Sequence, residues 1–267
     1  MALAGRRPFG RLLRTPPRAD NSSPDVKAII IGAGRGIRLM PTTADTPKCL
    51  AEVRGRRILD WTLEALAVNG IRRVAFIGGY RIEKVRQEYP ALVFHHNTAW
   101  ETNNILASLM CAEAEMDEPF LCCYSDILFT PEVASRAAAS EDDIAVVVDT
   151  DWKARYAHRS QHPSGDAEKV TARNGAVTRI HRAIAEAEAH GEFIGVAKFS
   201  AAGARLLRDH ARRFRESGLR ERAFLIELFQ EMIERGLRIA HVDTAGGYME
   251  IDTQEDYELA RRFWSRG

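Results

Sequence analysis

The chain has 267 residues, of which 45% are hydrophobic, and its formal net charge is +1. This near balance of charge gives no sign of binding to nucleic acid through bulk electrostatics, so we expect no nucleic-acid partner. No apolar run approaches the roughly 18 residues that a membrane-spanning helix requires, so we expect no membrane partner. The length permits one large domain or two small ones.

The first 25 residues differ from the rest of the chain. Five arginines alternate with Leu, Pro and Ser, and Pro16-Pro17 would break a helix. Transit peptides share this composition, but the segment has no amphipathic stripe, and it lacks the apolar core of a secretory signal. We therefore predict a disordered Arg/Pro-rich tail over residues 1–25 and one folded domain over residues 26–267.

After residue 26, short apolar runs alternate with amphipathic segments. Apolar β-branched runs predict strands, and apolar residues at helical spacing predict helices. In the first half we expect strands at 26–31, 73–77, 92–95, 120–124 and 144–148, and helices at 58–68, 81–88 and 104–116. The last of these strands is uniformly apolar, which is typical of a central strand.

The second half is less regular. We expect a hairpin over 169–180 with Asn174-Gly175 as a type I′ turn, a strand at 193–199, helices at 201–217 and 222–235, a strand at 238–242 and a last helix from Thr253. Strands that alternate with helices predict an α/β fold, a mostly parallel mixed sheet of doubly wound type flanked by helices. The hairpin would form a small lid-like insertion.

The four cysteines show no C-x-x-C spacing. Cys122 and Cys123 are adjacent in an apolar run, so on a strand they would point to opposite faces. We predict buried thiols, not a disulfide or a zinc site, which fits a reducing cytoplasm.

Ligands bind such sheets at the carboxyl ends of the strands, and there the segment 28–39 turns through several glycines. The glycines allow backbone N–H groups to approach an anion, while Arg38 and Lys48 add positive charge. The turn lacks the third glycine of the G-x-G-x-x-G dinucleotide fingerprint, because Ile37 or Leu39 stands there, and it lacks the Lys-Ser or Lys-Thr of a Walker A loop. These absences argue against an oxidoreductase and a P-loop enzyme.

The pattern that does fit is G-x-G-x-x-R followed by P-x-T and P-K. It resembles the loop of nucleotidyltransferases that activate phosphorylated small molecules. Such a reaction brings several anionic groups together, so the site needs cations. Mg²⁺ prefers one or two carboxylates with substrate oxygens. Asp126 follows an apolar strand and Asp252 precedes the last helix, and we predict that both hold Mg²⁺. Alone, each could be a cap, since Asp252 and Glu255 resemble a capping box.

The resemblance extends from about Val26 to the end of the chain. Its segments are Gly32 to Lys48, Ile77 to Tyr80, Asn103-Asn104, Tyr124 to Ile127, Asp166 to Lys169, Gly191 to Gly195 and Glu250 to Asp252. The chain is similar to choline-phosphate cytidylyltransferases, and more so to those that activate 2-aminoethylphosphonate or 2-hydroxyethylphosphonate. The resemblance implies a GT-A/Rossmann-like nucleotidyltransferase fold, Mg²⁺ at Asp126 and Asp252, and CTP as donor. Members that activate phosphorylated glutamine share the middle segment, so the acceptor stays open.

The expected site residues fall into three groups. Lys48 and Arg38 would be catalytic. The nucleotide would be bound by Gly32, Ala33, Gly34, Arg35, Gly36, Gly79, Tyr80, Asn103, Asn104 and Ser108. The acceptor would be bound by Trp152, Tyr156, Asp166, Lys169, Arg182, Glu192 and Glu250.

Several of these residues have a structural alternative. Asn103 or Asn104 could cap a helix, Trp152 and Tyr156 could pack a lid, and the charged residues could form a solvated surface cluster. Relatives often carry a lysine for the acceptor's phosphoryl group in the stretch where this chain has Arg182. We assign no role to the eight histidines, which show no metal-ligand spacing.

We therefore expect a Mg²⁺-dependent enzyme that transfers CMP from CTP to a small phosphonate or phosphomonoester, with 2-aminoethylphosphonate or 2-hydroxyethylphosphonate as the first choice. Phosphocholine and phosphorylated glutamine are alternative acceptors. A sugar-1-phosphate nucleotidyltransferase is the rival enzyme, and a nucleotide-sensing domain is the rival without catalysis. The sequence allows a homodimer but does not require one.

Overall fold

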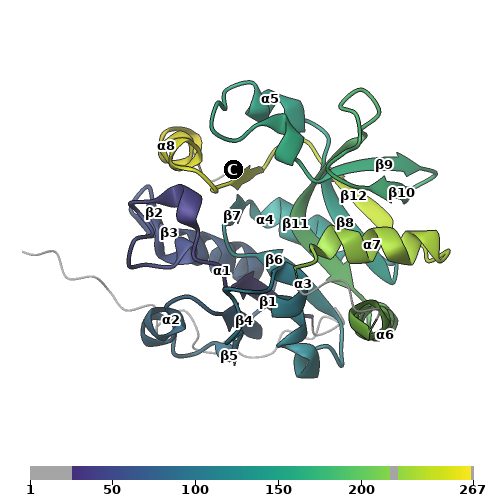
Figure 1. Ribbon diagram of the computed structural model, residues 1–267, viewed down its shortest axis with the longest axis horizontal. Helices are drawn as coiled ribbons and strands as arrows, with labels where there is room; N and C mark the ends of the chain where they lie inside the picture. Colours follow the sequence, from purple (N-terminus) through teal and green to yellow (C-terminus); the bar gives the residue numbers. More distant parts are fainter. Residues whose placement is uncertain (1–25, 217–221, 266–267) are drawn as a thin grey trace, which may run out of the picture.

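The computed structural model describes residues 26–216 and 222–265 (Figure 1). Its main sheet contains β1 (Lys27–Gly32), β4 (Val74–Gly78), β5 (Val93–His96), β6 (Phe120–Tyr124), β8 (Ile144–Asp149), β9 (Lys169–Arg173), β10 (Ala176–Ile180), β11 (Gly191–Phe199) and β12 (Ala240–Thr244). Their order across the sheet is β5-β4-β1-β6-β11-β8-β12-β10-β9. The predicted tail over residues 1–25 lies outside the described residues.

The sheet is mixed. Strands β5, β4, β1 and β6 run parallel to one another, and β12 runs parallel to β8. Strand β11 is antiparallel to both β6 and β8, and the β9–β10 hairpin is antiparallel to β12. The predicted α/β fold is confirmed, but the sheet contains more antiparallel pairing than we expected. Uniformly apolar strands do not reveal direction, because a strand buried on both faces reads the same either way.

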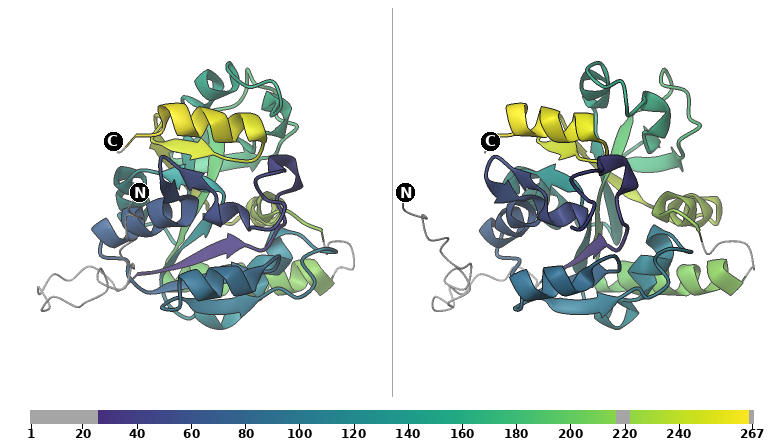
Figure 2. Two further views of the ribbon diagram at one scale, coloured as in Figure 1. Left: turned by 90° about the vertical axis from the view of Figure 1, so that its left-hand side faces the viewer. Right: turned by 60° about the vertical axis from the view of Figure 1, so that its left-hand side comes forward.

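Helices cover both faces of this sheet (Figures 1 and 2). They are α1 (Ile58–Val68), α2 (Ile82–Glu88), α3 (Ile105–Met110), α4 (Pro131–Ala138), α5 (Trp152–Tyr156), α6 (Ala201–Glu216), α7 (Leu225–Glu234) and α8 (Gln254–Phe263). Residues of α1 and α4 belong to the apolar core on one sheet face, and residues of α3, α6 and α7 belong to the core on the other.

Side-chain alternation along the strands divides these two cores. Ile29 and Cys122 contact the core of α3, α6 and α7, whereas Ile30 and Cys123 contact that of α1 and α4. Both thiols are buried and free, as predicted. At the hairpin, Asn174 and Gly175 have φ values of 52° and 72°, which fits the predicted type I′ turn.

One predicted element needs correction. The helix expected over 104–116 ends at Met110, and a 3₁₀ turn follows at Glu113–Glu115. In this turn Glu115 accepts hydrogen bonds from Lys27 and His95, which lie far from it in the chain. These contacts are formed where we expected a further turn of α-helix. The final helix begins where we expected it, with Thr253 as its cap paired with Asp256, so the alternative in which Asp252 caps this helix does not hold.

Short elements escaped the sequence analysis. They are α4, α5, the 3₁₀ turns at Ile37–Leu39 and Lys48–Leu50, the ribbon of β2 (Glu52–Val53) with β3 (Arg56–Arg57), and the pair of β7 (Ile127–Phe129) with β13 (Tyr248–Glu250). Among the described helices, none is long and apolar enough to span a bilayer.

Close packing of α6 on β8 depends on Gly203. A Cβ atom at this position would lie 1.9 Å from the Asp143 carbonyl oxygen. We predict that Gly203→Ala lowers the free energy of unfolding by about 1–3 kcal/mol, as overpacking does elsewhere. Denaturant unfolding measures this, with Gly165→Ala as control because a Cβ there has no atom within 4 Å. Equal stability of the two variants would contradict the packing argument.

Candidate active site

The parallel strands β1, β4 and β6 end at one edge of the sheet. Gly32 is in register with Gly78, and Ile31 is in register with Tyr124. A pocket of about 290 Å³ opens at this edge, lined by residues from the glycine-rich turn to Asp252. The strand ends therefore converge as the sequence predicts.

The pairing of β7 with β13 brings the two predicted metal ligands together. Glu250 is opposite Ile127, and the backbone N–H of Ile251 donates to the Asp126 carbonyl at 2.8 Å. The residues that follow β6 and β13 therefore meet at the pocket. Glu250 and Asp252 both line it, while Ile251 between them is fully buried, as the alternation of side chains along an extended chain requires.

Lys48 joins the two carboxylates. Its Nζ lies 3.0 Å from an Asp126 oxygen and also contacts Asp252, which in turn binds the Arg38 guanidinium. The aliphatic stem of Lys48 crosses Gly36, where a Cβ atom would come within 2.5 Å of it. Gly36 has φ 69°, so glycine meets both the steric and the conformational demand of this turn.

These charges shift one another's pKa values. Burial alone would lower the pKa of Lys48, but the neighbouring Asp126 and Asp252 outweigh it and raise this pKa. Burial opposes ionisation of Asp252, yet the charges of Lys48 and Arg38 lower its pKa. Asp252 is therefore available as an anionic ligand at neutral pH.

The donor set fits a divalent ion. Asp126 and Asp252 both contact the Lys48 Nζ, so the space between the two carboxylates accommodates a positively charged group. His162, Glu250 and Asp252 offer a further set of ligand atoms within 4.8 Å of one another. Hard carboxylate oxygens beside an open pocket suit Mg²⁺.

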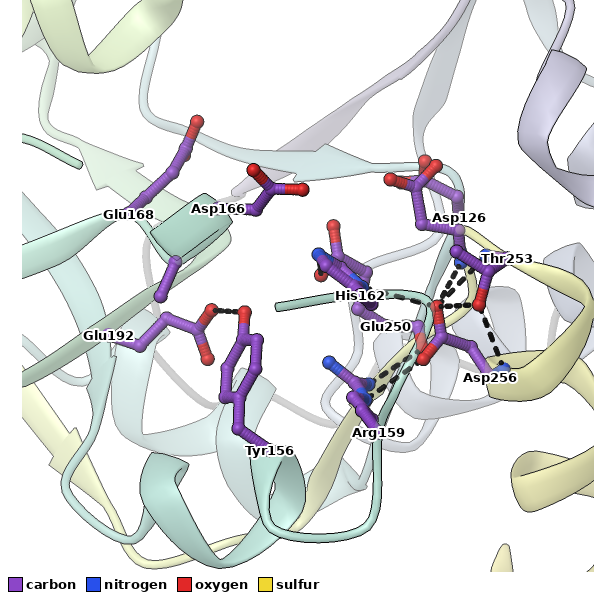
Figure 3. A network of polar contacts seen from close by, with 12 residues as sticks. Asp126, Tyr156, Arg159, His162, Asp166, Glu168, Glu192, Glu250, Thr253 and Asp256 are labelled. Atoms are coloured by element: carbon purple, nitrogen blue, oxygen red, sulfur yellow. Dashed lines mark hydrogen bonds and ion pairs between the residues drawn. The ribbon is translucent and has the colours of Figure 1, made fainter. Parts of the chain in front are cut away.

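A buried polar network supports this corner of the pocket (Figure 3). Asp256 is fully buried and accepts hydrogen bonds from Thr253 and contacts His162 at 3.1 Å and Arg159 at 2.9 Å. His162 lines the pocket, although the sequence analysis gave no role to any histidine. Its partners Glu250 and Asp256 lie about 90 residues away in the chain, so spacing alone could not indicate it.

On the nucleotide side the structure brings most of the predicted residues together. Those that line the pocket are Gly32, Ala33, Gly34, Gly36, Asn103, Asn104 and Ser108. Asn104 also caps α3, so the structural alternative holds for it as well. Asn103 exchanges hydrogen bonds with Asn97, which also donates to Ser108.

Three residues expected on the nucleotide side do not line the pocket. Tyr80 donates from its hydroxyl to the Ala44 carbonyl and from its N–H to that of Ala33. Arg35 lies over the Tyr80 ring, and Gly79 packs against Trp100. These three residues contact the loop or one another outside the pocket lining, so their direct contact with the nucleotide stays a prediction.

On the acceptor side, Asp166, Arg182, Glu192 and Glu250 line the pocket. Trp152, Tyr156 and Lys169 do not, and this corrects the expected aromatic wall. Trp152 and Tyr156 are buried against each other, and the Tyr156 hydroxyl donates to Glu192 (Figure 3). Lys169 donates to the backbone carbonyls of Ser164 and Ala167.

Glu168, Tyr124 and Phe224 also line the pocket, although we did not predict them as site residues. Tyr124 ends a predicted strand, and Glu168 lies in a segment that carries the family resemblance, so both could have been selected. Burial raises the pKa of Glu168 to about 7 although Arg182 opposes this. Phe224 lies under the Arg182 guanidinium, a contact that only tertiary packing creates.

The pocket carries a surplus of acid. Its lining contains three arginine or lysine side chains, Arg38, Lys48 and Arg182, against six carboxylates, Asp126, Asp166, Glu168, Glu192, Glu250 and Asp252. Each of these carboxylates has a basic partner, Glu192 with Arg155 and Glu250 with His162 among them. The lining itself still contains more acidic than basic side chains, which favours ligands that bring positive charge.

The buried carboxyl of Glu168 gives a pH-dependent prediction. Because its folded pKa is about 7, against 4.5 ordinarily, the folded protein holds this proton more tightly than the unfolded chain does. The resulting stability is complete below about pH 4.5 and is lost as pH rises through about 7, by up to roughly 3 kcal/mol. We predict that the ligand-free protein loses less stability between pH 5 and pH 8 after Glu168→Gln. Thermal unfolding at both pH values checks this, and an unchanged difference would contradict it.

Comparison with known proteins places the chain among nucleotidyltransferases. Residues 28–190 match the model of the MobA-like NTP transferase domain. The chain is 29% identical to a CTP:phosphoglutamine cytidylyltransferase of Campylobacter jejuni, over 88% of this chain and 98% of that protein. It is 35% identical to a CMP-5′-(3-aminopropyl)phosphonate synthase of Streptomyces rubellomurinus, over 45% of this chain but only 20% of that protein.

A solved structure has the same fold as this chain. The CTP:phosphocholine cytidylyltransferase of Streptococcus pneumoniae superimposes with a TM-score of 0.71 at 21% identity, over 89% of this chain and 98% of that one. This likeness shows a shared fold, and it confirms the nucleotidyltransferase fold predicted from the sequence.

Proposed function

The chain belongs to the family of MobA-like NTP transferase domains and is a nucleotidyltransferase, and we propose that it transfers CMP from CTP to a small acceptor that carries a phosphonate or phosphate group. The single observation that carries this proposal is the convergence of Lys48, Arg38 and the two carboxylates of Asp126 and Asp252 on one pocket beside the glycine-rich turn.

In this reaction an acceptor oxygen attacks the α-phosphorus of CTP. The new P–O bond forms as the bond to the β-phosphate oxygen breaks, and pyrophosphate leaves. The acceptor oxygen is already ionised, so no side-chain nucleophile is required. Lys48 and Arg38 neutralise the charge on the triphosphate and on the leaving group. The backbone N–H groups of the turn position the phosphates.

A divalent ion, for which we propose Mg²⁺, would be held by Asp126 and Asp252 and would supply charge neutralisation between the α-phosphate and the acceptor. The Lys48 ammonium between these two carboxylates supports this placement. The sequence and the relatives that are cytidylyltransferases support CTP as the donor.

The acidic lining of the pocket narrows the choice of acceptor. From the sequence we favour 2-aminoethylphosphonate or 2-hydroxyethylphosphonate, and the surplus of carboxylates supports an acceptor with an amino group over a neutral hydroxyl or a sugar phosphate. 2-Aminoethylphosphonate, phosphocholine and phosphoglutamine all carry a cationic nitrogen. We therefore propose an amine-bearing acceptor.

A pyrophosphate-release assay tests the proposal. The four ribonucleoside triphosphates would be crossed, with Mg²⁺ present, against 2-aminoethylphosphonate, 2-hydroxyethylphosphonate, phosphocholine, phosphoglutamine and glucose-1-phosphate. Release with CTP and an amine-bearing acceptor is the expected result. Release with glucose-1-phosphate would indicate the sugar nucleotidyltransferase instead, and release with none would favour the nucleotide-sensing alternative.

Lys48 provides the sharpest mutational prediction. We predict that Lys48→Ala lowers kcat by about 10²–10³-fold, the loss typical of one charge-stabilising donor. The control is Lys153→Ala, an exposed lysine that does not line the pocket. Near-normal turnover by the Lys48→Ala variant, with its fold verified by circular dichroism, would contradict the proposed mechanism.

A further inference from the structure

The acceptor end of the pocket contains polar atoms without partners. Within residues 26–216 and 222–265, the Tyr124 hydroxyl, Glu168 Oε2 and Arg182 Nε are buried and form no hydrogen bond. All three residues line the pocket. A buried polar atom without a partner costs free energy, so three of them together require an explanation.

Glu168 and Arg182 face this space as a pair of opposite charges. Arg182 Nη2 donates to Glu168 Oε1 at 3.1 Å, which leaves Oε2 and Nε for other partners. The exposed fraction of the side chain is 38% for Arg182 and only 10% for Glu168. The guanidinium can therefore still be reached from the pocket, while the carboxylate lies deeper.

Apolar packing fixes the orientation of these groups. The guanidinium carbon of Arg182 lies 4.1 Å from the centre of the Phe224 ring. The Tyr124 ring packs at right angles to Phe193, with centroids 5.9 Å apart. Stacked guanidinium groups keep their N–H edges in the plane of the group, where a carboxylate can accept two of them.

We infer that this end of the pocket binds a zwitterionic head group, the ammonium and carboxylate of an α-amino acid, at the end of the acceptor remote from its phosphonate or phosphate. The ammonium would donate to Glu168 and to the Tyr124 oxygen, and the carboxylate would accept from Arg182. This inference rests on the proposed function and narrows its acceptor to phosphono- or phosphoryl derivatives of amino acids.

Three phosphonates of matched length test the inference. 2-Amino-4-phosphonobutanoate has both head-group charges, 3-aminopropylphosphonate lacks the carboxylate, and 4-phosphonobutanoate lacks the ammonium. We expect kcat/KM for the amino acid to exceed that of either truncated compound by about 100-fold, because each truncation leaves a protein charge unpaired. Equal use of the amino acid and 3-aminopropylphosphonate would overturn the inference.

Two variants test separately which side chain binds the carboxylate and which binds the ammonium of the head group. Arg182→Gln should reduce the preference for the amino acid over 3-aminopropylphosphonate to within about 3-fold, and Glu168→Gln should do the same for its preference over 4-phosphonobutanoate. Arg179→Gln is the matched control, an arginine on β10 that is 56% exposed and outside the pocket, and it should keep both preferences. Preferences that survive in both pocket variants would place the head group elsewhere.

Direct binding separates this inference from the proposed function. Calorimetric titration of the three phosphonates into protein with Mg²⁺ and α,β-methylene-CTP needs no turnover. Tighter binding of the amino acid, lost in Arg182→Gln, would support the head-group site even if no acceptor released pyrophosphate. Turnover of another amine-bearing acceptor, without preferential binding of the amino acid, would sustain the proposed function and overturn this inference.

Discussion

The site depends on one ionic contact, the Lys48 ammonium between the carboxylates of Asp126 and Asp252. An isolated buried carboxylate would resist ionisation, and two adjacent ones would repel each other. A shared cation removes both difficulties and holds the two carboxylates in one place. Because Lys48 follows the glycine-rich turn, the same contact connects the phosphate-binding loop to the two acidic residues.

This contact requires the two-stranded pairing of β7 with β13, because that pairing sets Asp126 beside the segment that leads to Asp252. The corner is held from behind by Asp256, which anchors Arg159 and His162 and also caps α8 through Thr253. A buried acid with several partners is stable only while all are present. The geometry of this corner of the pocket and the start of helix α8 therefore depend on the same buried network.

At the opposite end of the pocket the charged side chains are paired differently. Near Lys48 every carboxylate has a cationic partner, but at Glu168 and Arg182 the pairing is incomplete, with one free atom on each side chain. Buried atoms without a hydrogen-bond partner also occur away from the pocket, on Asp149, Arg155 and Asp256, but among the described residues that line the pocket they occur only on Tyr124, Glu168 and Arg182. Protein charges therefore arrange the phosphate end of the pocket, and a ligand would complete the head-group end that we infer.

The sequence alone determined the α/β class, most strand positions, the glycine-rich loop, and Arg38, Lys48, Asp126 and Asp252 as members of one site, because these features depend on local periodicity and on motif spacing. Tertiary structure alone decided the antiparallel direction of β11, the burial of Trp152 and Tyr156, and the arrival of His162 and Phe224 at the pocket. Each of these depends on contacts between residues far apart in the chain, and local sequence carries no record of which distant residue will be the neighbour.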